Sequence, residues 1–172
     1  VVFLGDYLDD FGDTPEIARK TAMWLRFSLK QENRIHLIGN HDLPLFAASR
    51  YAKSCSGYTQ AKDEAVNEVL NYGDWNKLKW FHWVDDWLLT HAGLCKHFCK
   101  YTIQKDVANF LDKELAIAQK KVYKINGSHW FFRAGLARGG NEVVGGLTWC
   151  DFNSEFVPID GIKQVFGHTP QR

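Results

Sequence analysis

Four short apolar runs in this 172-residue chain each lead into a turn in which glycine lies close to polar side chains. The turns are Gly5-Asp6 with Asp9, Gly39-Asn40-His41-Asp42, Thr90-His91-Ala92-Gly93 and Gly167-His168-Thr169. Apolar runs that stop at glycine are typical of buried strands, and open α/β sheets bind their ligands at the carboxyl ends of strands. The pattern therefore predicts an α/β fold with polar side chains gathered at one edge of a sheet.

The first two turns enclose a strand–helix–strand unit. Residues 1–4 and 34–38 are apolar enough for strands, and the helix between them is expected over residues 17–30. Thr14 followed by Pro15 is a typical helix start, because Thr caps the helix and Pro fits its first turn. The unit predicts two parallel strands whose polar ends, Asp6 and Asn40, lie side by side.

The rest of the chain predicts further helices and strands. Trp80, Trp83 and Trp87 are spaced as on one helix face, which favours a core position for all three. The other expected elements are strands at 87–90 and 162–166, an amphipathic helix at 102–122, a mainly helical segment at 43–83 and a mobile glycine-rich loop at 135–146.

Composition restricts the class of protein. The net charge is +1 with 45% hydrophobic residues, which favours one globular domain and gives no support for a nucleic-acid or membrane partner. No apolar stretch approaches the ~18 residues of a membrane span, and we expect a cytoplasmic protein. The cysteines are few and unevenly placed, which favours unpaired thiols in a reducing compartment over a zinc site at Cys95 and Cys99.

The four turns, in this order, resemble the motifs of the calcineurin-like metallophosphoesterase superfamily, and the final G-H-T-P resembles its phage and bacterial phosphoprotein-phosphatase branch. The resemblance runs from Gly5 to Pro170 and lacks only the first family motif, D-x-H. It implies one catalytic domain over residues 1–172, with a four-layer β-sandwich flanked by helices and helical insertions around 43–83 and 96–125. Because the sequence starts inside an expected strand, we expect a fragment cut at both ends, with D-x-H upstream and further strands downstream.

The resemblance also implies roles for individual residues. Two divalent metal ions, with Mn favoured over Fe or Zn, would be held partly by this chain. Asp6 matches the carboxylate that bridges them, and the other matching ligands are Asn40, His91 and His168. His41 matches the catalytic acid that protonates the leaving oxygen, and Asp9 matches the carboxylate that orients it. The implied reaction is attack of a metal-activated hydroxide on a phosphomonoester or phosphodiester.

One position departs from the phosphoprotein-phosphatase pattern. Asp10 stands where that branch has an arginine that grips phosphate, so another cation is needed for this role. Arg138, which lies beside flexible glycines, fits either this role or that of an ordinary solvated side chain. For Arg133 the ordinary interpretation is favoured.

Two questions stay open at this level. A catalytically degenerate metal-binding or scaffold protein on the same fold is an alternative to the enzyme, and the substrate class and oligomeric state are not indicated. The remaining polar residues have structural interpretations. Asp42 is expected to cap the following turn, and the other histidines are expected to be structural: His36, His82, His97 and His129.

Overall fold

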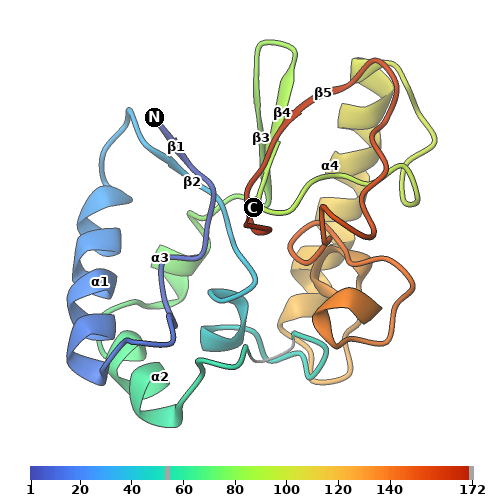
Figure 1. Cartoon of the computed structure of the whole chain (residues 1–172). Coiled ribbons are helices and arrows are strands. Elements are labelled where there is room, and N and C mark those ends of the chain that lie inside the picture. Colours follow the sequence, from blue (N-terminus) through green and yellow to red (C-terminus); the bar gives the residue numbers. More distant parts are fainter. Residues whose placement is uncertain (53–54, 171–172) are drawn as a thin grey trace.

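The computed structural model describes residues 1–52 and 55–170. In Figure 1 the strands lie between helix α1 on one side and helix α4 on the other. They form two small sheets, one with strands β1 (Val2–Phe3) and β2 (Ile35–His36) and one with strands β3 (Phe81–Val84), β4 (Trp87–Thr90) and β5 (Lys163–Val165). The predicted α/β class is confirmed.

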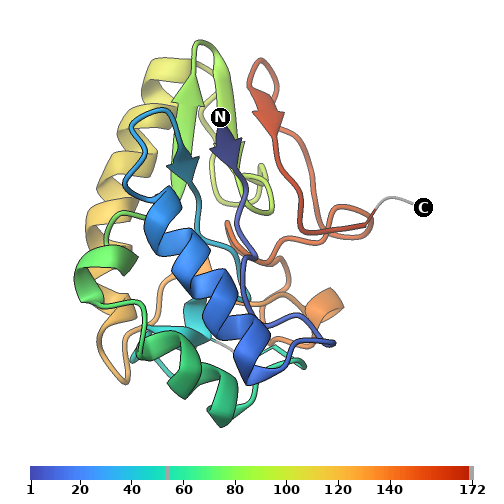
Figure 2. The ribbon, with the colours of Figure 1, turned by 90° about the vertical axis from the view of Figure 1, so that its left-hand side faces the viewer.

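The strand–helix–strand unit forms as the sequence predicts. Helix α1 (Pro15–Ser28) is capped by Thr14, whose hydroxyl accepts the N–H of Ile17. Its buried face packs into the main core and against helix α2 (Gln60–Asn67) (Figure 2). Strands β1 and β2 pair in parallel with Val2 opposite Ile35, so their carboxyl ends reach the same edge.

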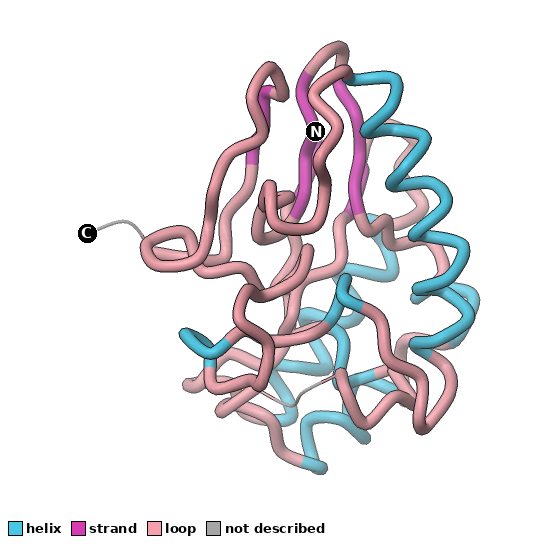
Figure 3. Tube along the Cα trace, turned by 90° about the vertical axis from the view of Figure 1, so that its right-hand side faces the viewer, coloured by secondary structure: helices cyan, strands magenta, loops and turns pink. Residues whose placement is uncertain are grey.

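The second sheet brings its own parallel pair to that region. Strands β4 and β5 are parallel with Leu88 opposite Gln164, and β3 pairs with β4 as an antiparallel hairpin. Helix α4 (Gln104–Val122) runs beside this sheet (Figure 3), and its buried residues Val107 and Leu111 belong to the main core. The predictions of a strand at 87–90 and a helix at 102–122 are confirmed within a few residues.

The segment at 43–83 is less helical than predicted. It contains a short 3-10 helix (Leu43–Leu45), α2 and α3 (Tyr72–Trp75), and it ends in strand β3; residues 53–54 lie outside the described residues. The predicted core position is confirmed for Trp80, which is buried, and for Trp83, which is half-buried against the main core. It is wrong for Trp87, which is 42% exposed, because Trp83 and Trp87 lie on the two strands of a hairpin rather than on one helix face.

The segment at 135–146 contains a 3-10 helix (Leu136–Arg138) and an isolated bridge between Gly135 and Glu142. The domain boundaries and the insertions stay predictions. None of the described helices combines the length and the apolar character needed to cross a bilayer.

Candidate metal centre

The two parallel strand pairs bring all four predicted turns together. Asp6 follows β1, Asn40 and His41 follow β2, His91 follows β4 and His168 follows β5. The Nε2 atom of His91 lies 2.9 Å from Oδ1 of Asn40, 3.1 Å from Nδ1 of His168 and 3.3 Å from Oδ2 of Asp6. The four side chains predicted as metal ligands therefore converge at one point, although they come from both sheets.

Glycines let the first two turns touch. A Cβ on Gly39 would lie 2.1 Å from Oδ1 of Asp6, and one on Gly5 would lie 2.5 Å from the backbone nitrogen of Gly39. Gly5 also has a φ of +99°, a backbone angle that residues with a side chain rarely adopt. Glycine at both positions is therefore a steric requirement of this contact.

Three site residues have unusual backbone conformations. Asp6, Asp9 and His168 have φ values of 57°, 72° and 68°, and Asp85 in the β3–β4 turn is the fourth such non-glycine residue in the described chain. Each conformation of this kind costs roughly 1–3 kcal/mol and persists where surrounding contacts enforce it. Backbone strain is therefore concentrated around the convergent side chains.

The side chain of Asp42 makes some of the contacts that hold these backbone conformations. Its predicted role as a cap of the following turn is wrong. Its side chain makes no capping bond to the 3-10 helix that follows. Instead Oδ2 accepts the N–H groups of Gly39 (2.9 Å) and Asp6 (3.0 Å), while Oδ1 accepts that of Tyr7 (3.0 Å). Burial and the nearby charge of Asp6 raise the pKa of Asp42 to about 7. The carboxyl group fixes the first turn to the second.

The donor set fits a cation. Nδ1 of His91 lies 2.7 Å from the carbonyl oxygen of Leu4, and when it donates its proton there, Nε2 carries only a lone pair. That lone pair then faces the oxygens of Asn40 and Asp6, so a cation placed among these three atoms would be bound by all of them. Nε2 of His168 is also buried and has no hydrogen-bond partner among the described residues. Imidazole, amide and carboxylate ligands suit Mn, Fe and Zn.

Burial and the close contacts among the site residues shift the pKa values of Asp6, His91 and His168. Burial acts to raise the pKa of Asp6, but the hydrogen bond and charge of His91 outweigh it and lower that pKa to about 2. Burial acts to lower the pKa of His91, but Asp6 outweighs it, so that pKa is raised. Burial and the neighbouring His91 lower the pKa of His168 to about 3. In the metal-free protein a proton on His91 is therefore favoured by the Asp6 carboxylate, while the ring of His168 is kept neutral, so a metal ion would take the place of that proton.

His41 and Asp9 lie next to this centre. The backbone N–H of His41 donates to Oδ1 of Asp6 at 3.0 Å, which ties the histidine to the centre. Its Nδ1 lies 3.2 Å from the carbonyl oxygen of Asp9 and 3.7 Å from the Oδ2 carboxylate atom. The structure therefore brings the predicted pair together, with the main chain of Asp9 closer to the ring than its side chain.

Lys62 is a residue that the sequence did not single out. Its ammonium group is buried and donates to the carbonyl oxygens of Asp10 and Gly57, each at 2.8 Å. It also lies 3.5 Å from Oδ1 of Asp9, and its charge partly offsets the burial that raises the pKa of Asp9. Helical spacing alone gives no sign that a lysine of α2 reaches the loop after β1.

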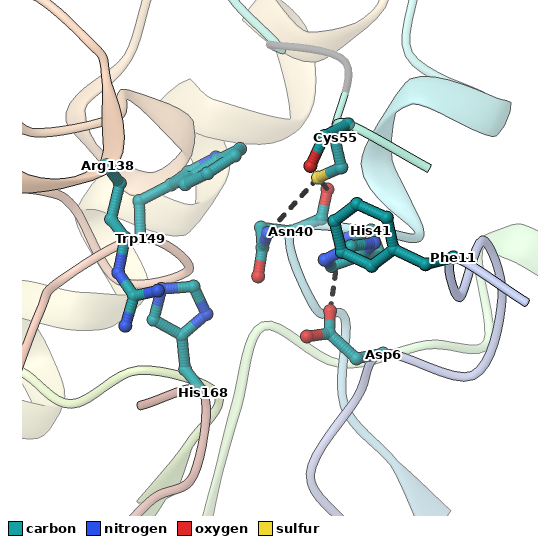
Figure 4. Close-up of a pocket in the computed structure, with 9 residues that line it drawn as sticks. Asp6, Phe11, Asn40, His41, Cys55, Arg138, Trp149 and His168 are labelled. Carbon is teal, nitrogen blue, oxygen red and sulfur yellow. Dashed lines mark hydrogen bonds between the residues drawn. The ribbon is translucent and has the colours of Figure 1, made fainter. Parts of the chain in front are cut away.

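A cavity of about 460 Å³ opens beside the centre and has Arg138 on its wall. In Figure 4, Arg138, Trp149 and His168 face Cys55, His41 and Phe11 across this space. Arg138 forms an ion pair with Asp151 (2.8 Å) and donates to the hydroxyl of Thr169 (3.0 Å). The guanidinium of Arg138 therefore lies across the cavity from His41, and its role in binding phosphate stays a prediction.

Asp10 lies outside that cavity. It lines a neighbouring cavity of about 420 Å³, which shares Asp6 and His41 with the first, and its carboxylate accepts the N–H of Phe11. Arg133 pairs with Glu142 and stacks on Tyr51, 4.7 Å from the ring centroid. Asp10, which stands in place of the arginine of the related branch, therefore adds no negative charge to the lining of the larger cavity.

The other histidines and the cysteines have structural surroundings. His36 is buried with Nε2 2.8 Å from the hydroxyl oxygen of Ser28, and His129 pairs with Glu114 at 3.1 Å. All four cysteines are free thiols, and Cys95 and Cys99 share no group of metal-ligand atoms in the part of the chain that the structure describes. Cys55 differs from the other three because it lines the cavity.

The sequence model of the calcineurin-like phosphoesterase family matches residues 1–172, and the chain belongs to this family. No curated protein and no solved structure is significantly similar to it. Family membership indicates a hydrolase that acts on phosphoric esters with the help of metal, in agreement with the donor set at Asp6, Asn40, His91 and His168.

Proposed function

We propose that this protein hydrolyses phosphate esters in the cavity between His41 and Arg138. The observation that carries the proposal is the convergence of a carboxylate, an amide and two imidazoles beside the cavity. His41 lines the same cavity, and Arg138 lies on its opposite wall. Each feature alone has a structural explanation. Together they supply a cation site, a proton donor and a phosphate-binding group within one cavity.

The ligand roles follow from the donor set. Asp6, Asn40, His91 and His168 would hold a divalent cation. Such a cation would lower the pKa of a water molecule and neutralise charge on the phosphoryl oxygens. We infer that a second ion also binds at Asp6 and that Mn is the native metal, as the family resemblance implies. The four-layer arrangement of the family and the phosphoprotein-phosphatase branch belong to the same proposal, supported by the two sheets between α1 and α4 and by the G-H-T-P block.

His41 would give a proton to the leaving oxygen. Because Nδ1 faces the carbonyl and carboxylate oxygens of Asp9, it is the nitrogen that keeps its own proton, and Nε2 is left for the transfer. The bond from the His41 backbone to Asp6 keeps the ring beside the cation site. Proton donation of this kind typically contributes ~10²–10⁴-fold to the rate.

Arg138 would hold the phosphate of the substrate. The carboxylate of Asp151 and the hydroxyl of Thr169 fix its guanidinium at the cavity wall. A guanidinium can bind two phosphate oxygens at once, which orients the ester as well as attracting it. The partner of this protein is therefore a phosphorylated substrate, and its alcohol part would lie toward Phe11 and Trp149, which also line the cavity.

The test is hydrolysis of p-nitrophenyl phosphate and bis-p-nitrophenyl phosphate by the full-length protein, with Mn²⁺ and with EDTA. We expect turnover that requires Mn²⁺ and stops with EDTA, and the preferred ester separates a monoesterase from a diesterase. Bound metal without turnover of either ester would instead support the degenerate or scaffold protein.

A further inference from the structure

A second group of metal-ligand side chains lies next to the proposed centre. Ligand atoms of Asp9, His41 and Cys55 all lie within 4.8 Å of one another. Asp9 and His41 come from the turns after β1 and β2, and Cys55 comes from the segment before α2. The proposed hydrolysis gives Cys55 no role, although its thiol lines the cavity.

The carboxylate of Asp9 points to a missing partner in this group. Its side chain is 1% exposed, and Lys62 contacts only one of its oxygens, Oδ1. Oδ2 is fully buried and has no hydrogen-bond partner among residues 1–52 and 55–170, while Nδ1 of His41 lies 3.7 Å away from it. A buried carboxylate oxygen without a partner is costly. A cation between Asp9 and His41 would remove that cost.

Cys55 completes a donor set of distinct chemistry. Its sulfur accepts a hydrogen bond from Nδ2 of Asn40 at 3.2 Å, which holds the thiol beside the centre. Thiolate, imidazole and carboxylate together are ligands of zinc, whereas Mn and Mg prefer oxygen. Bond lengths of ~2.0–2.3 Å place the ligand atoms of a tetrahedral zinc site roughly 3.3–3.6 Å apart. The ligand atoms of this group lie within 4.8 Å of one another, so each pair needs to close by at most ~1.5 Å.

We propose that Asp9, His41 and Cys55 form a zinc site, separate from the centre at Asp6, whose occupation switches the enzyme off. Zinc binding displaces the thiol proton of Cys55 to solvent and moves the proton of the neutral His41 ring from Nδ1 to Nε2, and a water molecule completes the coordination. The inhibition rests on the proposed function, because with zinc on Nδ1 the ring of His41 can no longer hold the second proton that it would give to the leaving oxygen. The binding itself does not depend on catalysis.

Asn40 connects the two sites. Its Oδ1 lies 2.9 Å from Nε2 of His91, and its Nδ2 donates to the sulfur of Cys55. A thiolate accepts this bond more strongly than a thiol does, so zinc binding keeps the oxygen of Asn40 turned toward the first centre. The inhibited protein therefore retains its metal at Asp6.

The binding test uses Co²⁺ as a probe, because a thiolate bound to Co²⁺ gives a charge-transfer absorption in the near ultraviolet. The full-length protein is first loaded with Mn²⁺ to fill the oxygen- and nitrogen-rich centre, and Co²⁺ is then titrated. We compare wild type, Cys55→Ser, whose hydroxyl can still accept the Asn40 amide bond, and the control Cys99→Ala, which removes a buried thiol elsewhere. The band is expected in wild type and Cys99→Ala and is expected to be lost in Cys55→Ser. Absence of the band in wild type, or its persistence in Cys55→Ser, overturns the proposal.

The inhibition test titrates Zn²⁺ into the Mn²⁺-loaded protein and follows p-nitrophenyl phosphate turnover, with each variant compared with its own zinc-free rate. We expect Cys55→Ser to need at least ~10-fold more zinc for half-inhibition than wild type or Cys99→Ala, as loss of a site group typically costs 10–100-fold in metal affinity. Equal sensitivity of the three proteins overturns the inhibitory role. If no protein shows turnover, the proposed function fails, while the cobalt band still decides whether the zinc site exists.

Discussion

Nε2 of His91 lies 3.1 Å from Nδ1 of His168, although the two residues are 77 positions apart in the chain. The contact follows from the parallel pairing of β4 and β5, which is continued by a hydrogen bond from the N–H of Gly167 to the carbonyl oxygen of His91. The two imidazoles are therefore placed by the sheet itself. A cation site built on strand ends needs little movement to bind its metal.

The first prediction concerns His168 as a ligand. His168→Gly removes the imidazole and accepts the φ of 68° without strain, so the turn can keep its shape. We expect the dissociation constant for Mn²⁺ to rise by at least ~10–100-fold, the range reported for groups that only support a ligand. Titration followed by electron paramagnetic resonance of free Mn²⁺ measures this, with the exposed His97→Ala as control. Equal affinity in both variants would remove His168 from the site.

The second prediction concerns the proton donor. His41→Ala is expected to lower kcat by ~10²–10⁴-fold for phenyl phosphate, whose leaving group needs a proton. The loss for p-nitrophenyl phosphate is expected to be smaller, because its leaving group is stable as an anion. Mn²⁺ affinity should stay within a few-fold of wild type, since the His41 ring is not a ligand of the first centre. An equal loss for both esters would argue against general acid catalysis by His41.

The third prediction concerns the contact between the first two turns. Gly39→Ala would put a methyl group 2.1 Å from Oδ1 of Asp6, so the two turns must separate and the ligands with them. We expect weakened Mn²⁺ binding and a lower midpoint of urea unfolding. Gly12→Ala is the matched control, because a Cβ there meets no atom within 4 Å. A well-bound metal in Gly39→Ala would show that this close approach is dispensable.

The features that the sequence predicted correctly are local ones. Thr14 and Pro15 determine where α1 begins, and the apolar run from Trp87 to Thr90 ends where the polar turn starts. The positions of the four turns on parallel strand ends were enough to expect their side chains in one place. Such signals depend only on neighbouring residues, and a parallel pair of strands then converts them into proximity.

The features that were missed or wrong depend on contacts far along the chain. Asp42 binds backbone groups of the previous strand end, 35 and 36 residues away, rather than the turn that follows it. Lys62 reaches Asp10 across 52 residues, and nothing in its own helix indicates this. The spacing of the three tryptophans is compatible with a helix and with a hairpin. The chain forms a hairpin, with the turn between its two strands at Asp85, which has a φ of 53°.

The fourth prediction concerns phosphate binding. Arg138→Ala is expected to raise KM for p-nitrophenyl phosphate by roughly 10- to 100-fold, the equivalent of one charge-assisted hydrogen bond of ~1.5–3 kcal/mol. Arg133→Ala is the control, because that guanidinium pairs with Glu142 and stacks on Tyr51. Steady-state kinetics at saturating Mn²⁺ measure both. The same KM in wild type and Arg138→Ala would show that another group binds the phosphate.

The fifth prediction concerns stability against pH and a residue away from the metal centre. His36 stacks on Phe3 with ring centroids 4.6 Å apart, and burial, together with the charge of Arg34, lowers its pKa from 6.5 to about 4. Between these two values the unfolded chain binds a proton at this position and the folded chain does not, so its contribution to stability is complete above pH 6.5 and is lost as pH falls toward about 4.

His36→Gln removes this titration while keeping a polar group near Ser28. Urea unfolding of both proteins at pH 7 and pH 5 measures the effect, and the comparison uses the change in unfolding free energy with pH rather than its absolute value. Wild type should lose more stability than His36→Gln on going to pH 5, because only wild type must exclude a proton from this buried ring. Equal losses in the two proteins would mean that the folded protein accommodates a charged His36, and that the stacking on Phe3 does not require the neutral imidazole.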